Sequence, residues 1–184
     1  MPNLLQLGLD ITPDEFEVFS QFNHTYYWDM VLANTGISSS AGNVINVDLN
    51  APLALPAMPG IVQFLSPKAP AFSNLVQAYF SSPFYLSDAQ VKAAVLASVE
   101  KIQHANEYKP QGAVVFVEFN DHAPYALQVP VEAIAEGFYE KVNDLQGVRR
   151  TWYTGAACYG EDAGGIWQWF ENNILPRIVS ALKA

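Results

Sequence analysis

The sequence predicts an α+β fold, in which a mostly antiparallel sheet of about six strands packs with about three or four helices. Stretches rich in aromatic and β-branched residues, separated by turn residues, predict the strands, and capped amphipathic stretches predict the helices. Apolar residues make up 51% of the chain and charged residues 15%, which is the composition of a folded protein. Because 184 residues is an ordinary size for one core, we expect a single domain over residues 1–184.

The N-terminal third begins with a helix signal. Thr12 is a helix cap, followed by Pro13 and two acids, and the helix runs to about Phe19. The stretch at 22–33 is rich in aromatic residues and ends in Asn-Thr-Gly, so it predicts a long strand that closes in a turn. A short strand is expected at 43–48.

The next segment is rich in proline. Residues 51–60, APLALPAMPG, are excluded from helix and central sheet because proline lacks a backbone donor, and such a loop can form the wall of a pocket. Strands are predicted at 60–66 and 71–80, joined by a turn at 67–70. An antiparallel pair is the simplest arrangement of two strands so joined.

The second half of the chain alternates helix and strand signals. Ser87 caps an amphipathic helix that runs to about His104 and has valines on one face. The near-continuous apolar run at 112–121 predicts a strand in a central position. The remaining predicted elements are a helix over 131–146 that ends at Gly147, a strand over about 149–154, and a final helix that begins at Asp162.

Charge and hydropathy exclude several classes of partner. The formal net charge of −9 argues against nucleic acid, which needs clustered Lys and Arg to neutralise phosphates. No run approaches the roughly 18 apolar residues of a membrane span, and residues 1–16 lack a signal-peptide pattern, so we expect a cytoplasmic protein. The single cysteine, Cys158, is expected to be a buried structural thiol.

Several separated segments resemble one family. They are FNHTYYWDMVLANTG, LPAMPGI, YLSDAQVKAAVLASVEKI and the ending FYEKVNDLQGVRRTWYTGAA followed by IWQWFENNILP. Together, and in this order, they are similar to the C-terminal half of fungal FAD-dependent amine-oxidase-like dehydrogenases, the group that includes β-cyclopiazonate dehydrogenase. The resemblance implies that the antiparallel sheet is a substrate domain facing the flavin, and that the WYTGAA segment and the helix after it complete the FAD domain.

The sequence departs from that family at the dinucleotide site. It has no G-x-G-x-x-G turn, which a dinucleotide needs so that backbone N–H groups can approach its pyrophosphate. At the start of the last helix, Glu161 and Asp162 are expected to cap the free N–H groups themselves. We therefore expect no bound cofactor, although the GEDAGG loop could still hold a ligand group through backbone amides.

Strand alternation sorts the candidate site residues by face. If the mixed polar faces converge, five side chains line one cavity, with Asp29 and Glu118 as paired carboxylates whose burial would raise their pKa. Alternatively, this face is exposed to solvent and its acids only confer solubility. Phe116 alternates with Val117 and is expected on the same face as Glu118, as a further substrate contact. The five side chains are Tyr27, Asp29, Gln77, Tyr79 and Glu118.

Two histidines complete the candidates. His122 follows Asp121 and is a possible general base oriented by that carboxylate, although a polar cluster at a strand end is also ordinary turn chemistry. His24 lies on the aromatic face of its strand and is expected in a pocket wall. The spacing of His, Cys and acidic residues matches no metal motif, so no metal is expected.

These observations favour a cofactor-independent enzyme that cyclises or isomerises an apolar small molecule in an aromatic pocket, as part of fungal-type specialised metabolism. Two alternatives remain open: a binding protein without chemistry, and the substrate-binding half of a split FAD-dependent oxidoreductase whose partner chain carries the flavin. The composition is short of polar surface, which also predicts a homodimer that covers an apolar patch.

Overall fold

The computed structural model describes residues 8–66, 74–110 and 112–183. The chain forms two compact units: a sheet unit, Thr25–Tyr125, and a helical unit built from Met1–His24 and Ala126–Ala184. The expectation of a single domain over residues 1–184 stays a prediction.

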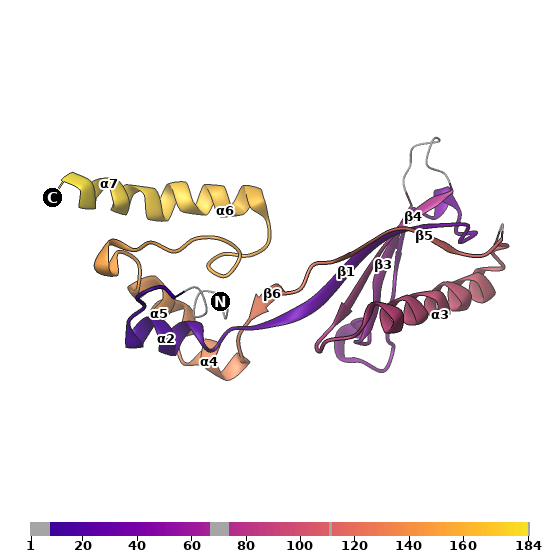
Figure 1. Cartoon of the computed structure of the whole chain (residues 1–184), viewed down its shortest axis with the longest axis horizontal. Helices are drawn as coiled ribbons and strands as arrows, with labels where there is room; N and C mark the ends of the chain where they lie inside the picture. The colour runs from indigo at the N-terminus through magenta and orange to yellow at the C-terminus, as the bar shows by residue number, and fades with distance from the viewer. Residues whose placement is uncertain (1–7, 67–73, 111, 184) are drawn as a thin grey trace. The chain divides into compact units, whose positions relative to one another are not determined.

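The sheet has six strands, in the order β2-β3-β4-β1-β5, with β6 pairing to β1 (Figure 1). The β1–β4, β1–β5, β2–β3 and β3–β4 pairs are antiparallel, which confirms the predicted α+β class. The predicted turn at 67–70 and the first residues of the strand predicted at 71–80 lie outside the described residues. The strand bounds are β1 Asn23–Ala33, β2 Asn43–Ile45, β3 Gly60–Leu65, β4 Leu75–Ser82, β5 Val115–Asp121 and β6 Tyr125–Gln128.

Strand β5 lies at an edge of the sheet, so its predicted central position is wrong. Val115 and Val117 are exposed, while the Phe116 and Phe119 rings pack against the core at one side. An apolar run indicates that a strand contacts a core, but it does not specify how many neighbours pair with the strand.

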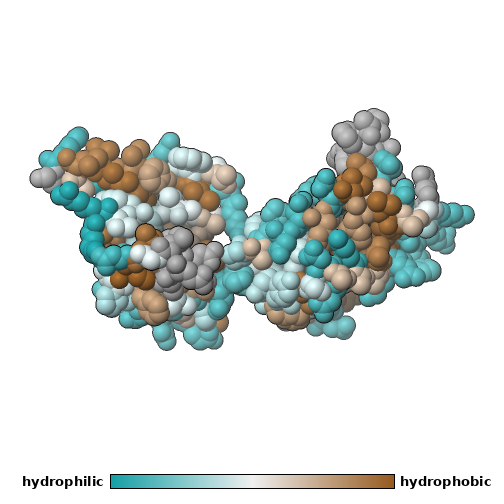
Figure 2. Space-filling model, viewed as in Figure 1, coloured by the Kyte–Doolittle hydropathy of each residue, from teal (hydrophilic) through white to brown (hydrophobic). Residues whose placement is uncertain are grey.

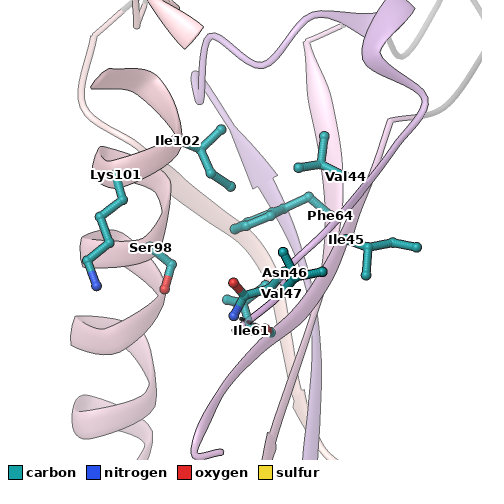
Figure 3. A pocket seen from close by; sticks show the side chains of 9 residues that line it. All are labelled: Val44, Ile45, Asn46, Val47, Ile61, Phe64, Ser98, Lys101 and Ile102. Atoms are coloured by element: carbon teal, nitrogen blue, oxygen red, sulfur yellow. Dashed lines mark hydrogen bonds between the residues drawn. The ribbon is translucent and has the colours of Figure 1, made fainter. Parts of the chain in front are cut away.

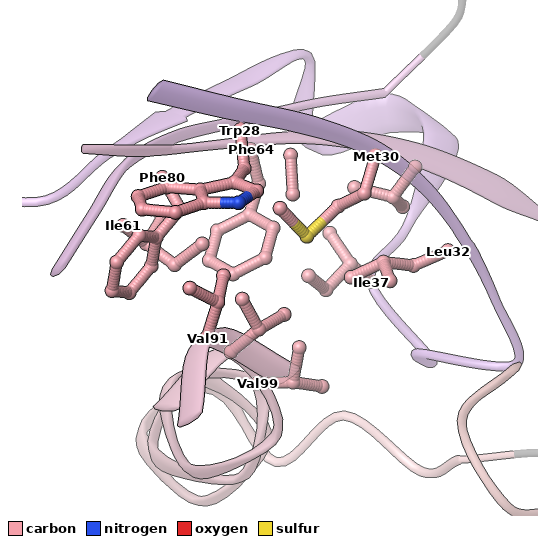
Figure 4. Packing of buried hydrophobic residues seen from close by; sticks show 12 residues of the cluster. Trp28, Met30, Leu32, Ile37, Ile61, Phe64, Phe80, Val91 and Val99 are labelled. Carbon is pink, nitrogen blue, oxygen red and sulfur yellow. The ribbon is translucent and has the colours of Figure 1, made fainter. Parts of the chain in front are cut away.

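Helix α3, Asp88–Asn106, covers one face of the sheet (Figure 1). Ser87 is its N-cap residue, as the sequence signal predicts, and the Ser87 N–H and hydroxyl both donate to Gln90 Oε1 at 2.9 Å. Three buried valines of this helix meet Trp28, Met30 and Leu32 of β1 in the main core (Figure 4). These valines are Val91, Val95 and Val99.

The helical unit packs around aromatic side chains of α2 and α5 and of the segment after α2. The Phe22 ring meets the Phe138 ring edge to face at 5.0 Å, and the Phe19 ring contacts the Tyr153 ring at 4.8 Å. The helix predicted over 131–146 is broken at Gly137, which has a φ of 80°. The helix bounds are α2 Pro13–Phe19, α4 Val131–Ala135, α5 Phe138–Asp144, α6 Ala163–Trp169 and α7 Leu175–Lys183, with a π-helical turn at Phe170–Ile174.

The strand predicted over about 149–154 is absent from the described fold. Residues Val148–Arg150 form a 3-10 turn in which both arginines have positive φ angles. The Gln146 side chain then donates to the Tyr153 carbonyl and accepts from the Tyr153 N–H, each at 2.8 Å. This amide makes the two hydrogen bonds that a neighbouring strand would otherwise make.

Within the residues that the structure describes, no helix combines the length and the apolar character needed to cross a membrane.

Candidate functional site

The face of the sheet opposite α3 carries most of the predicted site residues, and we call it the tyrosine face. The strand register places Asp29 opposite Tyr79 and opposite Asn120 of the two neighbouring strands. Its members on β1, β4 and β5 are Tyr27, Asp29, Val31, Gln77, Tyr79, Glu118 and Asn120. The register puts these five predicted site residues on one face of the sheet, and their lining of one cavity stays a prediction.

Asp29 and His122 form the polar centre of this face. The His122 Nε2 atom lies 2.9 Å from Asp29 Oδ1, and the His122 N–H donates to the Tyr27 carbonyl at 2.9 Å. Both side chains are partly exposed, at 48% for His122 and 28% for Asp29. The carboxylate that orients the His122 imidazole is thus Asp29, which lies 93 residues away in the sequence.

Asp121 is not the partner of His122. Its Oδ1 atom accepts the Ala123 N–H at 2.8 Å, so this side chain stabilises the turn after β5. The sequence reading paired Asp121 with His122 because they are neighbours in the chain. Only the antiparallel pairing of β1 with β5 brings Asp29 to the histidine.

Aromatic rings flank the Asp29–His122 pair. The Tyr27 ring stacks on the Tyr125 ring at a centroid distance of 4.4 Å, and on the Tyr79 ring at 5.9 Å. Burial, and next the negative charge of Asp29, raise the pKa of Tyr79 above its usual value. Sequence reasoning missed Tyr125, since it lies in β6, a short strand that no sequence signal indicated.

Glu118 is on the tyrosine face but is exposed to solvent. It stands opposite Val31, while Asn120 occupies the position opposite Asp29. The apolar neighbours of Glu118 suggested a buried acid, but as β5 is an edge strand this side chain remains accessible to water. Asp29 has a histidine partner, and its pairing with Glu118 stays a prediction.

Phe116 lies on the opposite face from Glu118. The register of β5 against β1 shifts between Val31 and Leu32, so that Phe116 pairs with the buried Leu32. A β-bulge inserts one unpaired residue, Val117, and so reverses the alternation of side chains along the strand. The Phe116 ring instead packs against Phe119, and the Lys92 ammonium lies over both rings.

His24 is half-buried on β1 and has the same strand parity as Trp28, so it points to the other side of the strand from Tyr27. It belongs to the helical unit, in which residues 8–24 pack with residues from 126 onward.

The start of helix α6 is capped by side chains of its own segment. The Asp162 side chain accepts the Gly165 N–H at 2.6 Å, as the predicted cap requires. A Cβ atom on Gly165 would lie 2.6 Å from Tyr159 Cε1, so the tyrosine ring already fills the space beside this glycine. One N–H group at this helix start, that of Gly165, is therefore already occupied by the chain itself.

The Cys158 thiol is partly buried and packs against the core of the helical unit. Burial raises the pKa of the Cys158 thiol to about 11, which makes it a poor nucleophile at neutral pH. Among the described residues, His, Cys, Asp and Glu form no group of three that could hold a metal ion.

The chain is similar to fungal flavoproteins. It is 34% identical over 180 residues to an FAD-dependent oxidoreductase of Cochliobolus heterostrophus. The matched region covers 95% of this chain and 36% of that protein. It is 25% identical over 174 residues to β-cyclopiazonate dehydrogenase of Aspergillus flavus, covering 95% of this chain and 37% of the relative. No family model matches the sequence.

A solved structure has the same fold. The crystal structure of a fatty acid isomerase from P. acnes that produces CLA superposes with a TM-score of 0.69 at 20% identity, over 89% of this chain and 36% of that one. The chain spans little more than a third of the length of the curated relatives it matches. It is a homologue of the fungal FAD-dependent oxidoreductases that include β-cyclopiazonate dehydrogenase, and it corresponds to one part of such a protein.

Proposed function

We propose that this chain is the substrate-binding part of an FAD-dependent oxidoreductase, and that the tyrosine face holds an apolar small molecule. One observation carries the proposal: three stacked tyrosines stand beside an acid–imidazole pair on the sheet face that the core does not use. Aromatic rings that are already stacked offer a flat apolar surface, and ordering them costs little further entropy on binding.

The Asp29–His122 pair supplies acid–base chemistry beside this surface. Asp29 accepts the Nε2–H of His122, which leaves the Nδ1 lone pair of the imidazole free to accept a proton from a bound substrate. Like any tyrosine, Tyr79 keeps its hydroxyl proton at neutral pH, and its raised pKa extends this to more alkaline pH, so it can donate a hydrogen bond to a substrate oxygen. His122 is thus the proposed proton acceptor, and Asp29 is its positioning residue.

The flavin of such an enzyme is held by another polypeptide segment, whether in a longer chain or in a partner flavoprotein. The Asp162 cap, which occupies the Gly165 N–H at the start of α6, supports this division. So does a surface on the helical unit: apolar side chains gather along α7, where Leu175, Val179 and Leu182 are exposed (Figure 2). An exposed apolar stripe of this kind favours contact with further protein, whether the flavin-holding part or a second copy of this chain in a homodimer.

A cofactor-independent isomerase or cyclase is the second candidate. The observation in its favour is the same acid–imidazole pair, because moving a proton from one carbon of an apolar substrate to another needs a base and a shaped pocket but no redox group.

Binding and turnover separate these candidates. We would titrate the chain with β-cyclopiazonate, the compound in the names of several relatives, by isothermal titration calorimetry. Tyr27→Ala is expected to weaken binding by about tenfold, since it removes the central ring of the stack, while Tyr85→Ala outside the tyrosine face is the matched control. Equal affinities for the two variants would contradict a substrate site on the tyrosine face.

The absorbance spectrum from 300 to 500 nm then tests whether the flavin is held by another polypeptide segment. We expect no flavin band to remain with the isolated chain after gel filtration from FAD. We expect such a band, and oxidation of the substrate, only when the remaining part of a relative is co-expressed. Conversion of a substrate by the flavin-free chain would instead support the isomerase, and a tightly bound flavin on the chain alone would contradict both candidates.

A further inference from the structure

A cavity of about 260 Å³ lies between α3 and the edge hairpin β2–β3 (Figure 3). Its inner wall includes Ile61 and Phe64, which belong to the main core and pair with Phe80 and Ala78 on the core side of β4. This places the cavity on the α3 side of the sheet, on the other face from Tyr27 and Tyr79. It is therefore separate from the site described above.

The cavity is apolar inside and polar at its mouth. In Figure 3, Ile102 reaches from α3 toward the Phe64 ring, and Val44 lies beyond that ring on β2, while Ser98 lines the cavity one turn earlier on α3. Strand β2 and its continuation leave Ile45 and Val47 more than half exposed beside this opening. Apolar walls without contact partners favour an apolar guest, since filling the space restores the missing contacts.

The polar residues that line the cavity indicate which charge a bound small molecule would carry. The Asn46 amide already donates to the Ile61 carbonyl at 3.0 Å, and the Ser98 hydroxyl donates to the Ala94 carbonyl at 2.9 Å. Lys101 is the charged residue in the lining, and it takes part in none of the ion pairs among residues 8–66, 74–110 and 112–183. In Figure 3 its side chain runs along the side of α3 that faces away from Phe64, so the flexible side chain has to turn toward the cavity to pair with a bound anion.

From this arrangement we propose that the cavity is a second small-molecule site, which binds an amphipathic anion with a short apolar chain or ring and a single carboxylate at Lys101. The apolar part lies between Ile61, Phe64 and Ile102, and the carboxylate pairs with the ammonium group at the mouth. The cavity has room for roughly nine water-sized groups at about 30 Å³ each, which corresponds to a guest of the size of octanoate. In a chain of net charge −9, binding of an anion depends on this local cation.

Octanoate is the probe for the test, and octan-1-ol is the uncharged ligand of equal chain length. We would label the isoleucine methyl groups and titrate the whole chain with each compound by NMR. The expected result is saturable binding of octanoate, with shifts at Ile61 and Ile102 and none at the tyrosine ring signals. Shifts confined to the tyrosine face, or no saturation, would overturn the proposal while leaving the function proposed above untouched.

Charge and volume variants complete the test. Lys101→Glu is expected to weaken octanoate binding by about tenfold and to leave octan-1-ol binding unchanged, because only the anion uses the ammonium group. Lys141→Glu, an equal charge change on the helical unit, is the control for a general effect of net charge. Ser98→Leu fills the mouth and should weaken both ligands. Equal octanoate affinities for the Lys101 and Lys141 variants would show that no carboxylate is held at Lys101.

Discussion

The two compact units differ in the interactions that stabilise each of them internally. The sheet unit has a core of apolar side chains from β1, β3, β4 and α3, and the Trp28, Leu32 and Phe80 side chains are fully buried there. The helical unit has a smaller aromatic core and also buries a carboxylic acid: Glu15 is 3% exposed and accepts the Thr12 N–H at 2.6 Å and the Tyr153 hydroxyl. Stability of the sheet unit therefore rests on apolar burial, whereas that of the helical unit also depends on an ionised group.

The charge on Glu15 makes the stability of the helical unit depend on pH. Burial alone would raise the pKa of Glu15, but hydrogen bonds from Thr12 and Tyr153 and the nearby charge of Arg149 outweigh it and lower the pKa below the usual value of 4.5. A carboxyl with a lowered folded-state pKa stabilises the fold above its unfolded pKa, and this stabilisation is lost as the pH falls through the folded value. We expect the helical unit to be the more acid-sensitive of the two.

The largest expected effect is in the sheet core. Trp28→Ala should destabilise the sheet unit by about 3–5 kcal/mol, because it leaves a cavity where a fully buried indole packs against Phe80. Chemical denaturation followed by circular dichroism measures this change. Trp28→Phe is the control and should cost less, since the buried Nε1–H of Trp28 has no hydrogen-bond partner among the described residues. Equal losses for the two variants would contradict a packing origin.

The second-largest expected loss of stability is in the helical unit, at Glu15. Glu15→Gln should destabilise it by about 1–3 kcal/mol at pH 7, because the charged acceptor of the Thr12 N–H and the Tyr153 hydroxyl is lost. Glu17→Gln, on an exposed position of the same helix, should change little. Hydrogen exchange measured separately for amides of α2 and of the strands distinguishes the units. The difference between wild type and Glu15→Gln should begin to shrink as the pH falls below 4.5 and should vanish below the lowered folded-state pKa, and a constant difference down to pH 2 would refute the role of the charge.

A substitution at Gly36, in the sheet unit, should have an intermediate effect on stability. Gly36 has a φ of 71°, and a Cβ atom there would lie 2.7 Å from the Lys109 carbonyl oxygen. Gly36→Ala should therefore cost about 1–3 kcal/mol in a thermal melt. Gly42 has a φ of 68° but open space around its Cβ position, so Gly42→Ala isolates the cost of the angle alone. Similar melting temperatures for the two variants would mean that the clash is relieved by movement of Lys109.

The smallest effect concerns the tyrosine face, which contributes little to the core. Asp29→Asn should lower the pKa of Tyr79 toward its usual value of 10.0, because the negative charge of Asp29 is one of the two causes that raise it. Stability should change by less than about 1 kcal/mol, since both Asp29 and its partner are partly exposed. An alkaline titration of tyrosine absorbance near 295 nm, with Asp48→Asn as the control, measures this shift. An unchanged titration would contradict the electrostatic link between Asp29 and Tyr79.

Local signals in the sequence were reliable where the physics is local. The Thr12 and Ser87 caps, the valine face of α3 and the Asp162 cap are all present in the structure, because each depends on residues within one or two helical turns. Strand alternation was equally informative for β1 and β4, whose register keeps Tyr27, Asp29, Gln77 and Tyr79 on one face.

Non-local features were missed or misassigned. The bulge at Val117 reversed the face of Phe116, and the edge position of β5 left Glu118 exposed. The strand predicted near 149–154 depended on a partner, and the Gln146 side chain took the place of that partner. Neither a register shift nor a side chain that replaces a strand leaves a mark on the local pattern of hydropathy.

The sequence by itself determined the α+β class, the capped helices and the resemblance to fungal FAD-dependent oxidoreductases, since these follow from hydropathy patterns and from residues in a shared order. Only the tertiary structure decided which acid meets His122. Asp29 lies 93 residues away and reaches the imidazole through the pairing of β1 with β5, whereas its sequence neighbour Asp121 turns toward the backbone. Pairing of distant strands is a property of the whole sheet, and it is set by burial of the opposite face beneath α3.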